Sequence, residues 1–488
     1  MTTDDRERRV IDAAPTGLFI GGTWRAASGG RTLAVEDPAT TDTLCRVADA
    51  TPEDATAALD AACAVQQQWA AMPPRERGEI LRRTYEIIIE RADELALLMT
   101  LEMAKPLAES TGEVTYAAEF LRWFAEEAVR IDGRWAREPG GKGRLVTMKQ
   151  PVGPCLLITP WNFPMAMGTR KIGPAVAAGC TMVVKPAQQT PLSMTMLASI
   201  MTEAGLPPGV LNVITASSAG KTVGPLMTDK RLRKMSFTGS TPVGQRLMEQ
   251  AAGNLLRISM ELGGNAPYLV FDDADLDLAV DQAMIAKMRN MGESCVAANR
   301  FHVQQGVAEE FAARLAERMG ALTIGRGTEA TVNVGPLIDG VQRTKVAELV
   351  DNAVDHGAKV MVGGEAPDRP GYFYAPTVLQ GVPQTADMFA EEIFGPVAPV
   401  YSFSTEEEAL AAANGSDYGL VAYAFTRDLG RSIRVMEGLE TGMVGMNKGL
   451  VSNAAAPFGG VKWSGFGREG GPEGIEEYLS TKYVAIDA

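Results

Sequence analysis

Short apolar, β-branched segments alternate with longer amphipathic ones along this chain, and this alternation limits its fold more than any other feature. Strand-like segments stand at 155–158, 181–185, 210–214 and 233–239, and each is followed by a helix-like stretch, such as 191–204. Alternating strand and helix patterns are typical of a parallel sheet covered by crossover helices. The sequence therefore predicts an α/β fold.

A second alternating series runs from about residue 275 to residue 425 and includes strand-like pieces at 301–304 and 358–364. The 488 residues also exceed the size of a single core, because one domain usually holds ~100–200 residues. Two α/β domains are expected. Further strand-like segments at 144–150 and 476–486 belong to neither series.

Composition narrows the class of protein. The net charge of −14 offers no basic excess to neutralise a phosphate backbone, so we expect no nucleic-acid partner. The opening residues are dominated by charge, and the apolar stretch at 175–184 is shorter than the ~20 residues that span a bilayer. Five scattered cysteines suit a reducing compartment better than a disulfide framework. We therefore expect a cytoplasmic protein with no secretory signal and no membrane partner.

The chain holds only two histidines, His302 and His356. Histidine is the commonest catalytic base and a frequent zinc ligand, so this scarcity argues against a serine–histidine triad and against a zinc site. His302 lies in a strand-like run, where a structural role is the usual one. We expect no metal ion.

One cysteine and one glutamate stand in contexts that suit chemistry. Cys295 lies in MGESCVAANR, where Gly292 allows a sharp turn that leaves backbone N–H groups free, and this context alone leaves catalysis and packing as equal alternatives. Glu261 ends a strand-like run before paired glycines, where partial burial can raise its pKa toward that of a general base. A capping role is the alternative for Glu261.

Two further segments suit the binding of a ligand, and one of them suits a pyrophosphate. Gly239 and Ser240 end a strand-like run just before a helix, whose N-terminus suits a pyrophosphate, although such a turn is usually structural. Lys185 stands at the carboxyl end of a predicted parallel strand, where ligands bind in open α/β sheets.

Seven motifs, in family order, make the chain resemble the aldehyde dehydrogenase superfamily across nearly its whole length. They are PWNFP (160–164), KPA (185–187), FTGS (237–240), ELGGNAP (261–267), ANR after the cysteine (298–300), EEIFGP (391–396) and PFGGVKWSGFGREG (457–470). Within the superfamily, the segments 169–180, 261–277 and 456–460 are most similar to the succinate-semialdehyde dehydrogenase branch.

The resemblance implies a covalent mechanism. Cys295 is then the nucleophile and Glu261 the general base, while the side chain of Asn162 and the Cys295 N–H donate to the oxyanion of the tetrahedral intermediate. Such donors stabilise charge that forms only as the thiolate adds to the aldehyde. Lys171 resembles a lysine near the family's proton exit path.

The resemblance also implies an NAD(P)+ site. Lys185 would hold the adenosine ribose, Gly239 and Ser240 the pyrophosphate, and Glu392 with Phe394 the nicotinamide ribose and its surroundings. Further contacts to the cofactor are expected from Thr159, Pro160, Trp161, Ala187, Gln188 and Leu262. Because Gln188 cannot repel a 2′-phosphate as a glutamate would, we expect both cofactors to work, with a preference for NADP+.

For the substrate, the same branch places Arg170, Arg300 and Ser452 around the distal carboxylate of a short semialdehyde. An arginine fork matches a carboxylate bidentately and stays charged. The alternative is that both arginines form structural salt bridges.

The implied architecture has a Rossmann-like dinucleotide-binding domain at 1–130 and 152–263 and a catalytic domain at 264–460. Segments 131–151 and 475–488 would be β oligomerisation arms of a homodimer or homotetramer.

Three other functions compete with this interpretation. A cysteine hydrolase or acyltransferase would not need Lys185, Gly239 and Glu392, and a non-catalytic protein of the same fold would be expected to lack Cys295 or Glu261. A CoA-acylating enzyme is the nearest alternative, but Glu261 favours hydrolysis of the thioester. Another aliphatic or aromatic aldehyde remains an alternative substrate.

Overall fold

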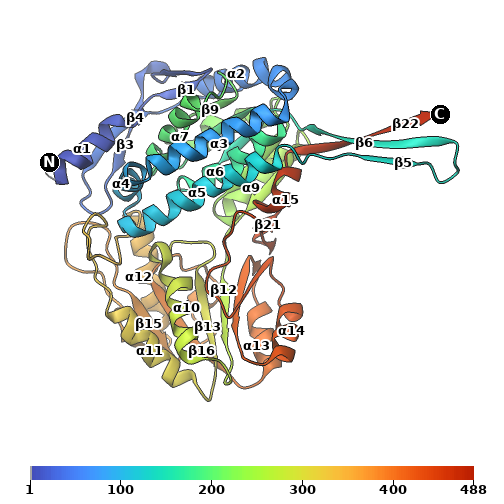
Figure 1. The fold of residues 1–488 in the computed structure, drawn as a ribbon. Coiled ribbons are helices and arrows are strands. Elements are labelled where there is room, and N and C mark those ends of the chain that lie inside the picture. Colours follow the sequence, from blue (N-terminus) through green and yellow to red (C-terminus); the bar gives the residue numbers. More distant parts are fainter. Residues whose placement is uncertain (1–2, 488) are drawn as a thin grey trace.

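The first series of predicted strands forms one sheet in the computed structural model, which describes residues 3–487. Its five central strands are parallel and their side chains are largely buried, because helices cover both faces (Figure 1). Short antiparallel strands complete both edges. In spatial order the strands are β2 (Thr23–Arg25), β1 (Leu18–Ile20), β9 (Leu211–Val213), β8 (Met182–Lys185), β7 (Cys155–Ile158), β10 (Lys234–Thr238), β11 (Arg257–Glu261) and β21 (Gly465–Phe466).

The helices of this first body pack in layers, with α3 and α5 over α6. The helix predicted at 191–204 is confirmed as α7, and the buried carboxylate of Glu102 accepts hydrogen bonds from its first N–H groups, at Leu192 and Ser193. The helices are α2 (Pro52–Ala71), α3 (Pro74–Glu90), α4 (Ala92–Met103), α5 (Leu107–Glu127), α6 (Ala166–Ala178), α7 (Leu192–Glu203), α8 (Ala219–Met227) and α9 (Thr241–Ala252).

The second series forms a second α/β body with a sheet of its own, and the two predicted α/β units are thus present. Six of its strands are parallel, and antiparallel β14 stands at one edge. In spatial order the strands are β14 (Lys359–Val362), β15 (Thr377–Gln380), β16 (Val397–Phe403), β13 (Ala298–Gln304), β12 (Ala266–Val270), β18 (Val421–Phe425) and β19 (Met443–Met446). The helices are α10 (Leu276–Met288), α11 (Ala308–Gly320), α12 (Gly340–Asp355), α13 (Glu406–Asn414) and α14 (Leu429–Gly438).

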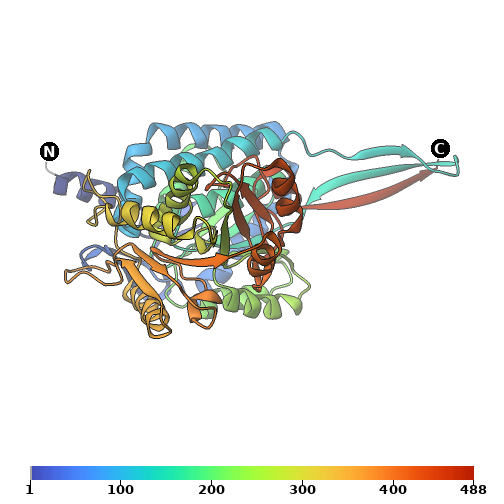
Figure 2. The ribbon, with the colours of Figure 1, turned by 90° about the horizontal axis from the view of Figure 1, so that it is seen from below.

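The two unassigned strand segments of the sequence meet in a three-stranded arm that projects from the first body (Figures 1 and 2). Strand β6 (Gly143–Pro151) lies between β5 (Arg134–Arg137) and β22 (Leu479–Asp487). The strand predicted from residue 476 begins later, because α15 (Gly471–Glu476) ends there. Residues 1, 2 and 488 of the predicted domain and arm ranges lie outside the described residues.

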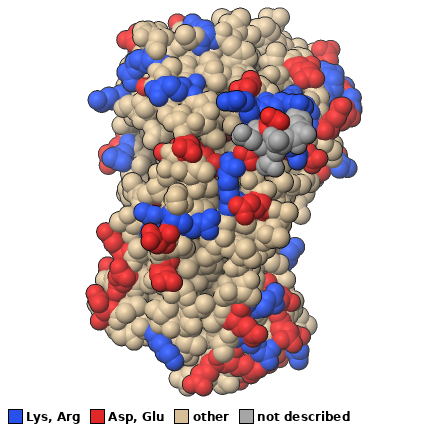
Figure 3. Space-filling model, turned by 90° about the vertical axis from the view of Figure 1, so that its left-hand side faces the viewer, with Lys and Arg blue, Asp and Glu red and all other residues tan. Residues whose placement is uncertain are grey.

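The N-terminal part of the chain is tied to the second body by charge. Arg326 contacts Glu7 in α1 (Thr3–Ala13) at 2.9 Å and Asp37 after β3 (Thr32–Glu36) at 2.8 Å. Acidic and basic side chains are interspersed over the face shown in Figure 3. Among residues 3–487, no helix combines the length and the apolarity needed to cross a bilayer.

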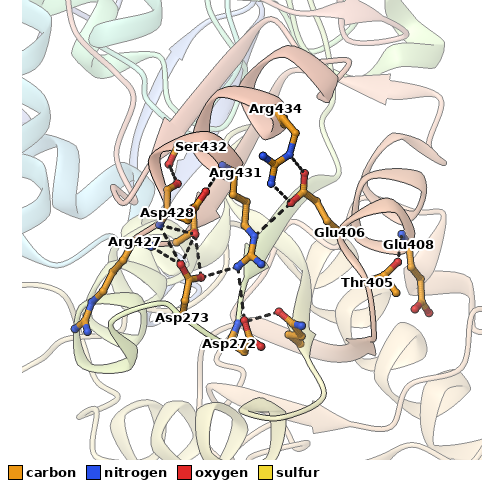
Figure 4. A network of polar contacts seen from close by, with 12 residues as sticks. Asp272, Asp273, Thr405, Glu406, Glu408, Arg427, Asp428, Arg431, Ser432 and Arg434 are labelled. Carbon is orange, nitrogen blue, oxygen red and sulfur yellow. Dashed lines mark hydrogen bonds and ion pairs between the residues drawn. The ribbon is translucent and has the colours of Figure 1, made fainter.

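A polar network on the second body joins the end of β12 to α14 (Figure 4). The carboxylate of Asp273 accepts hydrogen bonds from the Thr426 hydroxyl and the N–H groups of Arg427 and Asp428, and it pairs with Arg431 at 2.7 Å. Burial alone would raise the pKa of Asp273, but these hydrogen bonds hold it below its usual range.

We predict that Asp273→Ala destabilises the protein by about 2 kcal/mol at neutral pH, because several charge-assisted bonds are lost at a one-third-exposed site. A carboxylate with a lowered pKa stabilises the fold above its unfolded pKa and loses that effect as the pH falls. The difference in thermal midpoint from wild type should therefore shrink below about pH 4.

The control is Asp277→Ala, which removes only an exposed ion pair with Arg314 and should cost little. Equal midpoints for the two variants at neutral pH would contradict the role of Asp273.

Candidate active site

A cavity of about 220 Å³ lies between the two bodies and brings together much of the predicted site. The first body supplies its wall from the ends of β7, β10 and β11, and the second body supplies the cysteine loop and the loop before β16. Carboxyl ends of parallel strands are the usual ligand sites of such sheets. Nine predicted residues line it: Pro160, Trp161, Asn162, Gly239, Ser240, Leu262, Cys295, Glu392 and Phe394.

The cysteine loop follows α10 with three consecutive residues in the left-handed region, Asn290, Met291 and Gly292, at φ 55°, 53° and 76°. A Cβ on Gly292 would come within 2.2 Å of the Gly395 carbonyl oxygen, so this turn requires glycine. The turn presents Cys295 to the cavity. Burial raises the pKa of its thiol to about 12, although the charge of Arg170 opposes this.

Two hydrogen-bond donors adjoin the nucleophile. Within residues 3–487, no acceptor is found for the Cys295 N–H. The side-chain Nδ2 of Asn162 donates to the Glu293 carbonyl at 3.0 Å, which uses one of its two N–H bonds. Asn162 is buried and lines the cavity beside Cys295.

Glu261 ends β11 as a buried side chain, and neither of its carboxylate oxygens has a hydrogen-bond partner among the described residues. Burial, followed by the negative charge of Glu469, raises its pKa well above the usual range. A buried acid without partners destabilises a fold. The predicted catalytic role is consistent with this cost, whereas a capping role would leave visible hydrogen bonds.

Lys171 does not line the cavity but binds a residue that sequence reasoning missed, Glu469. Its Nζ donates to Glu469 Oε1 at 2.5 Å and to Ser236 Oγ at 2.8 Å, and Arg170 Nη2 lies 2.7 Å from Glu469 Oε2. Although burial alone would raise the pKa of Glu469, the two cations hold it below its usual range. Glu469 stands within the quoted motif 457–470, and an acid in that motif was the available signal.

Lys185 is a buried cation at the end of β8. Its ammonium group has no acceptor among the described residues, and burial lowers its pKa to about 8. Thr159 directly precedes Pro160 of the cavity wall and is buried. Its hydroxyl group also has no hydrogen-bond partner among the described residues. Ala187 is buried, whereas Gln188 is exposed and lines a separate hollow with Glu36, Asp339 and Tyr372.

The loop that carries Glu392 and Phe394 is held by two residues of α12 that the sequence did not reveal. Gln342 Nε2 donates to the Phe394 carbonyl and Lys345 Nζ to the Glu392 carbonyl, both at 2.6 Å. The Glu392 carboxylate accepts from the Gly264 N–H at 3.0 Å, and burial raises its pKa to about 7. Phe394 adopts a left-handed φ of 55° and meets the ring of Trp161 edge-on at 5.4 Å.

The structure does not bring Arg300, one of the residues expected around the substrate carboxylate, to the cavity. The guanidinium of Arg300 donates to the backbone carbonyls of Asn265, Ala412 and Ala413 at 2.8 to 3.0 Å and is buried away from the cavity lining. Arg300 therefore anchors β13 to the end of α13. Arg170, in contrast, keeps a buried Nε with no hydrogen-bond acceptor in the described chain.

Another arginine, which sequence reasoning missed, contacts Ser452. Arg289 Nη1 donates to Ser452 Oγ at 3.4 Å, and its guanidinium lies 4.8 Å from the ring centroid of Phe163 and 5.7 Å from that of Tyr116. No carboxylate of residues 3–487 forms an ion pair with Arg289. Its position six residues before Cys295 was the only signal in the sequence.

Comparison with known proteins agrees with the resemblance noted in the sequence. The sequence model of the family described as "Aldehyde dehydrogenase family" matches residues 24–484. A succinate-semialdehyde dehydrogenase of Paenarthrobacter nicotinovorans is 61% identical over 443 residues, which cover 91% of this chain and 98% of the relative. A glutarate-semialdehyde dehydrogenase of Pseudomonas putida is 50% identical over 96% of this chain and 97% of its own length.

A solved structure extends the agreement to the fold. The crystal structure of an E. coli NADP-dependent enzyme superposes with a TM-score of 0.96 at 48% identity and covers 98% of this chain and 99% of its own. The predicted α/β fold is thereby confirmed. A match in sequence over residues 24–484 and in fold over nearly the whole length places this chain in the aldehyde dehydrogenase family.

Proposed function

We propose that this enzyme oxidises a short semialdehyde that carries a carboxylate, such as succinate semialdehyde, to the dicarboxylate with NADP+ or NAD+. The observation that carries the proposal is the cavity in which Cys295 and Asn162 meet Gly239, Ser240, Glu392 and Phe394, which are among the residues expected to bind a dinucleotide. The names of the succinate- and glutarate-semialdehyde relatives support the substrate class.

In the proposed mechanism, Glu261 takes the proton of the Cys295 thiol and passes it to solvent, and the sulfur adds to the aldehyde carbon. The remaining N–H of the Asn162 amide and the Cys295 N–H donate to the carbonyl oxygen as it becomes negative. Oxidation leaves a thioester on Cys295. Glu261 then takes a proton from water, whose oxygen attacks the thioester carbon and releases the carboxylate and the thiol.

The residues present fit a nicotinamide dinucleotide. Lys185, a buried ammonium with no acceptor among residues 3–487, would bind ribose hydroxyl groups. Gly239 and Ser240 precede the N-terminus of α9 and would hold the pyrophosphate, and Glu392 would accept from the second ribose. When bound, the oxidised nicotinamide supplies the acceptor for the hydride. The E. coli structural relative is named as NADP-dependent, which supports the preference for NADP+.

The distal carboxylate of the substrate would bind Arg289 and Ser452, with Arg170 contributing its buried, unpartnered Nε. Arg289 is suited to this role because it is flanked by two aromatic rings and forms no ion pair with a carboxylate of residues 3–487. A guanidinium in such a setting is weakly hydrated and matches a carboxylate bidentately.

We also propose that residues 131–151 and 475–488 join copies of the chain as a homodimer or homotetramer, with 1–130 and 152–263 binding the dinucleotide and 264–460 carrying the nucleophile. The long arm supports the assembly because it exposes aromatic rings, including Trp135 at 67% and Tyr483 at 59%. Five unpaired cysteines are consistent with the expected cytoplasmic location.

We predict that Cys295→Ala falls below about 1% of wild-type turnover, since the bond-forming sulfur is lost. NADP+ should still bind, because this change leaves Lys185 and the β10–α9 turn intact. Formation of reduced cofactor with succinate semialdehyde reports turnover, and quenching of tryptophan fluorescence reports binding. Cys63→Ala, at a half-buried position on α2, is the matched control and should remain active. A Cys295→Ala enzyme that turned over like this control would rule out the covalent mechanism.

We predict that Arg289→Met raises KM for succinate semialdehyde roughly 10- to 100-fold, the value of one or two charge-assisted bonds. KM for butanal, an aldehyde of the same carbon number without the carboxylate, should change little. Arg343→Met, which removes an arginine placed over Tyr372 outside the Cys295 cavity, serves as the control. An equal rise in KM for both aldehydes would show that Arg289 shapes the pocket without binding the carboxylate.

A further inference from the structure

The main-chain carbonyl of Asn162 is held by two buried side chains that the mechanism above does not use. Lys105 Nζ donates to this oxygen at 2.7 Å, and Asn290 Nδ2 donates to it at 3.0 Å. Neither Lys105 nor Asn290 lines the cavity of Cys295. Both therefore contact Asn162, the proposed oxyanion donor, on the side away from the cavity.

Lys105 is fully buried in the turn between α4 and α5. Its Nζ lies 2.5 Å from Glu113 Oε2 and 4.2 Å above the ring centroid of Phe163. Burial lowers its pKa, which Glu113 opposes. A buried charge destabilises a fold unless it is paired and fully hydrogen-bonded. The Lys105 ammonium group meets this need with Glu113 and with the Asn162 carbonyl oxygen.

The same ion pair also holds the start of α6. The second oxygen of Glu113 accepts from the N–H groups of Met165 and Ala166, at 3.0 and 3.1 Å. The segment from Asn162 to Ala166 is thus held at both ends by one lysine–glutamate pair. Helix α6 carries Arg170 and Lys171, so their position depends on it too.

Asn290 links this segment to the cysteine loop. Its Nδ2 donates both to the Asn162 carbonyl and to the Glu293 carbonyl, the latter at 2.9 Å. The Glu293 carbonyl also accepts from the Asn162 side chain. The orientation of the Asn162 amide is therefore set by a closed ring of contacts between Asn162, Asn290 and Glu293, with Lys105 completing the bonds to the Asn162 carbonyl.

The second body packs directly against the turn that carries Lys105. A Cβ on Gly335 would come within 2.0 Å of the Ala104 carbonyl oxygen, and a Cβ on Gly327 within 2.5 Å of the Lys105 carbonyl oxygen. Both glycines therefore permit close backbone approach. Lys105 lies where the two bodies meet, behind the cavity that they share.

We propose that the Lys105–Glu113 pair is a positioning device that holds the Asn162 amide, and through it the oxyanion donors, in reactive geometry. This inference rests on the proposed function, because it assigns Asn162 to the oxyanion. Donors to an oxyanion act only when they are held within a few tenths of an ångström of their places. Lys105 contacts neither substrate nor cofactor and acts through Asn162.

The test is a double-mutant cycle of Lys105→Met and Asn162→Ala. Two reactions are followed: reduction of NADP+ with succinate semialdehyde, and hydrolysis of para-nitrophenyl acetate by Cys295, which needs neither cofactor nor semialdehyde. If Lys105 acts through Asn162, Lys105→Met lowers kcat about 10- to 100-fold in the wild-type background. In the Asn162→Ala background it should cost less than about threefold, because the group it positions is already gone.

Equal losses in both backgrounds, or no loss in the wild-type background, would overturn the proposal. The ester reaction keeps the two claims separate: coupling on the ester without NADP+ reduction would reject the proposed function and support the positioning role. Lys105→Arg keeps the charge and a donor, so it should recover part of the kcat that Lys105→Met loses. A purely structural role of Lys105 predicts instead that both substitutions lower kcat equally, in the wild-type and in the Asn162→Ala background alike.

Lys234→Met is the matched control, since Lys234 is another fully buried lysine, bonded to Ser259 and 3.6 Å from Glu477. It should lower the thermal midpoint without showing coupling to Asn162→Ala. If Lys105→Met does not fold, Glu113→Gln enters the same cycle, because its amide retains the volume and one acceptor while removing the charge. The predicted coupling and the result that would overturn it are the same for this variant.

Discussion

The rest of the active site depends on the ion pairs that the buried carboxylate of Glu469 forms. Glu469 binds both cations of α6, Lys171 and Arg170, while its own backbone pairs with Phe458, whose ring lies 3.9 Å from the Arg170 guanidinium. These contacts bring the C-terminal segment onto the first body beside β11. Because charges in a protein interior must be paired, the two positive charges are fixed to one acid. Glu261, the neighbouring acid, is left with no hydrogen-bond partner among residues 3–487.

This division between two acids sets their chemistry. Glu469 keeps a low pKa because Lys171 and Arg170 offset its burial, whereas burial and the charge of Glu469 raise the pKa of Glu261. Two carboxyl groups with separated pKa values are typical of sites where one group is structural and the other moves protons. Glu261 is therefore the acid that is free to take a proton from water in the proposed deacylation, and Glu469 stays ionised beside it.

The sequence was sufficient for the sheets and for the motifs, because strand burial, glycine turns and the cysteine loop are local features. It did not reveal Glu469, Arg289 or Lys105, whose roles depend on contacts between segments far apart in the chain. Arg300 shows the opposite case: it lies near Cys295 in sequence, yet its strand directs it to carbonyls at the end of α13. The direction of a side chain, and the contacts it makes between the two bodies, can be read only from the folded structure. The catalytic, cofactor-binding and substrate-binding roles of the individual residues remain predictions.

The proposed chemistry depends on a covalent thioester at Cys295 that Glu261 helps to hydrolyse. The most direct measurement is the intact mass of Glu261→Gln enzyme quenched during reaction with succinate semialdehyde and NADP+. We predict that a species heavier by one succinyl group accumulates and that peptide mapping places it on Cys295, because the hydride has left while water attack is slow. Reduced cofactor formed over many turnovers with no covalent species, or a species on another residue, would contradict the account.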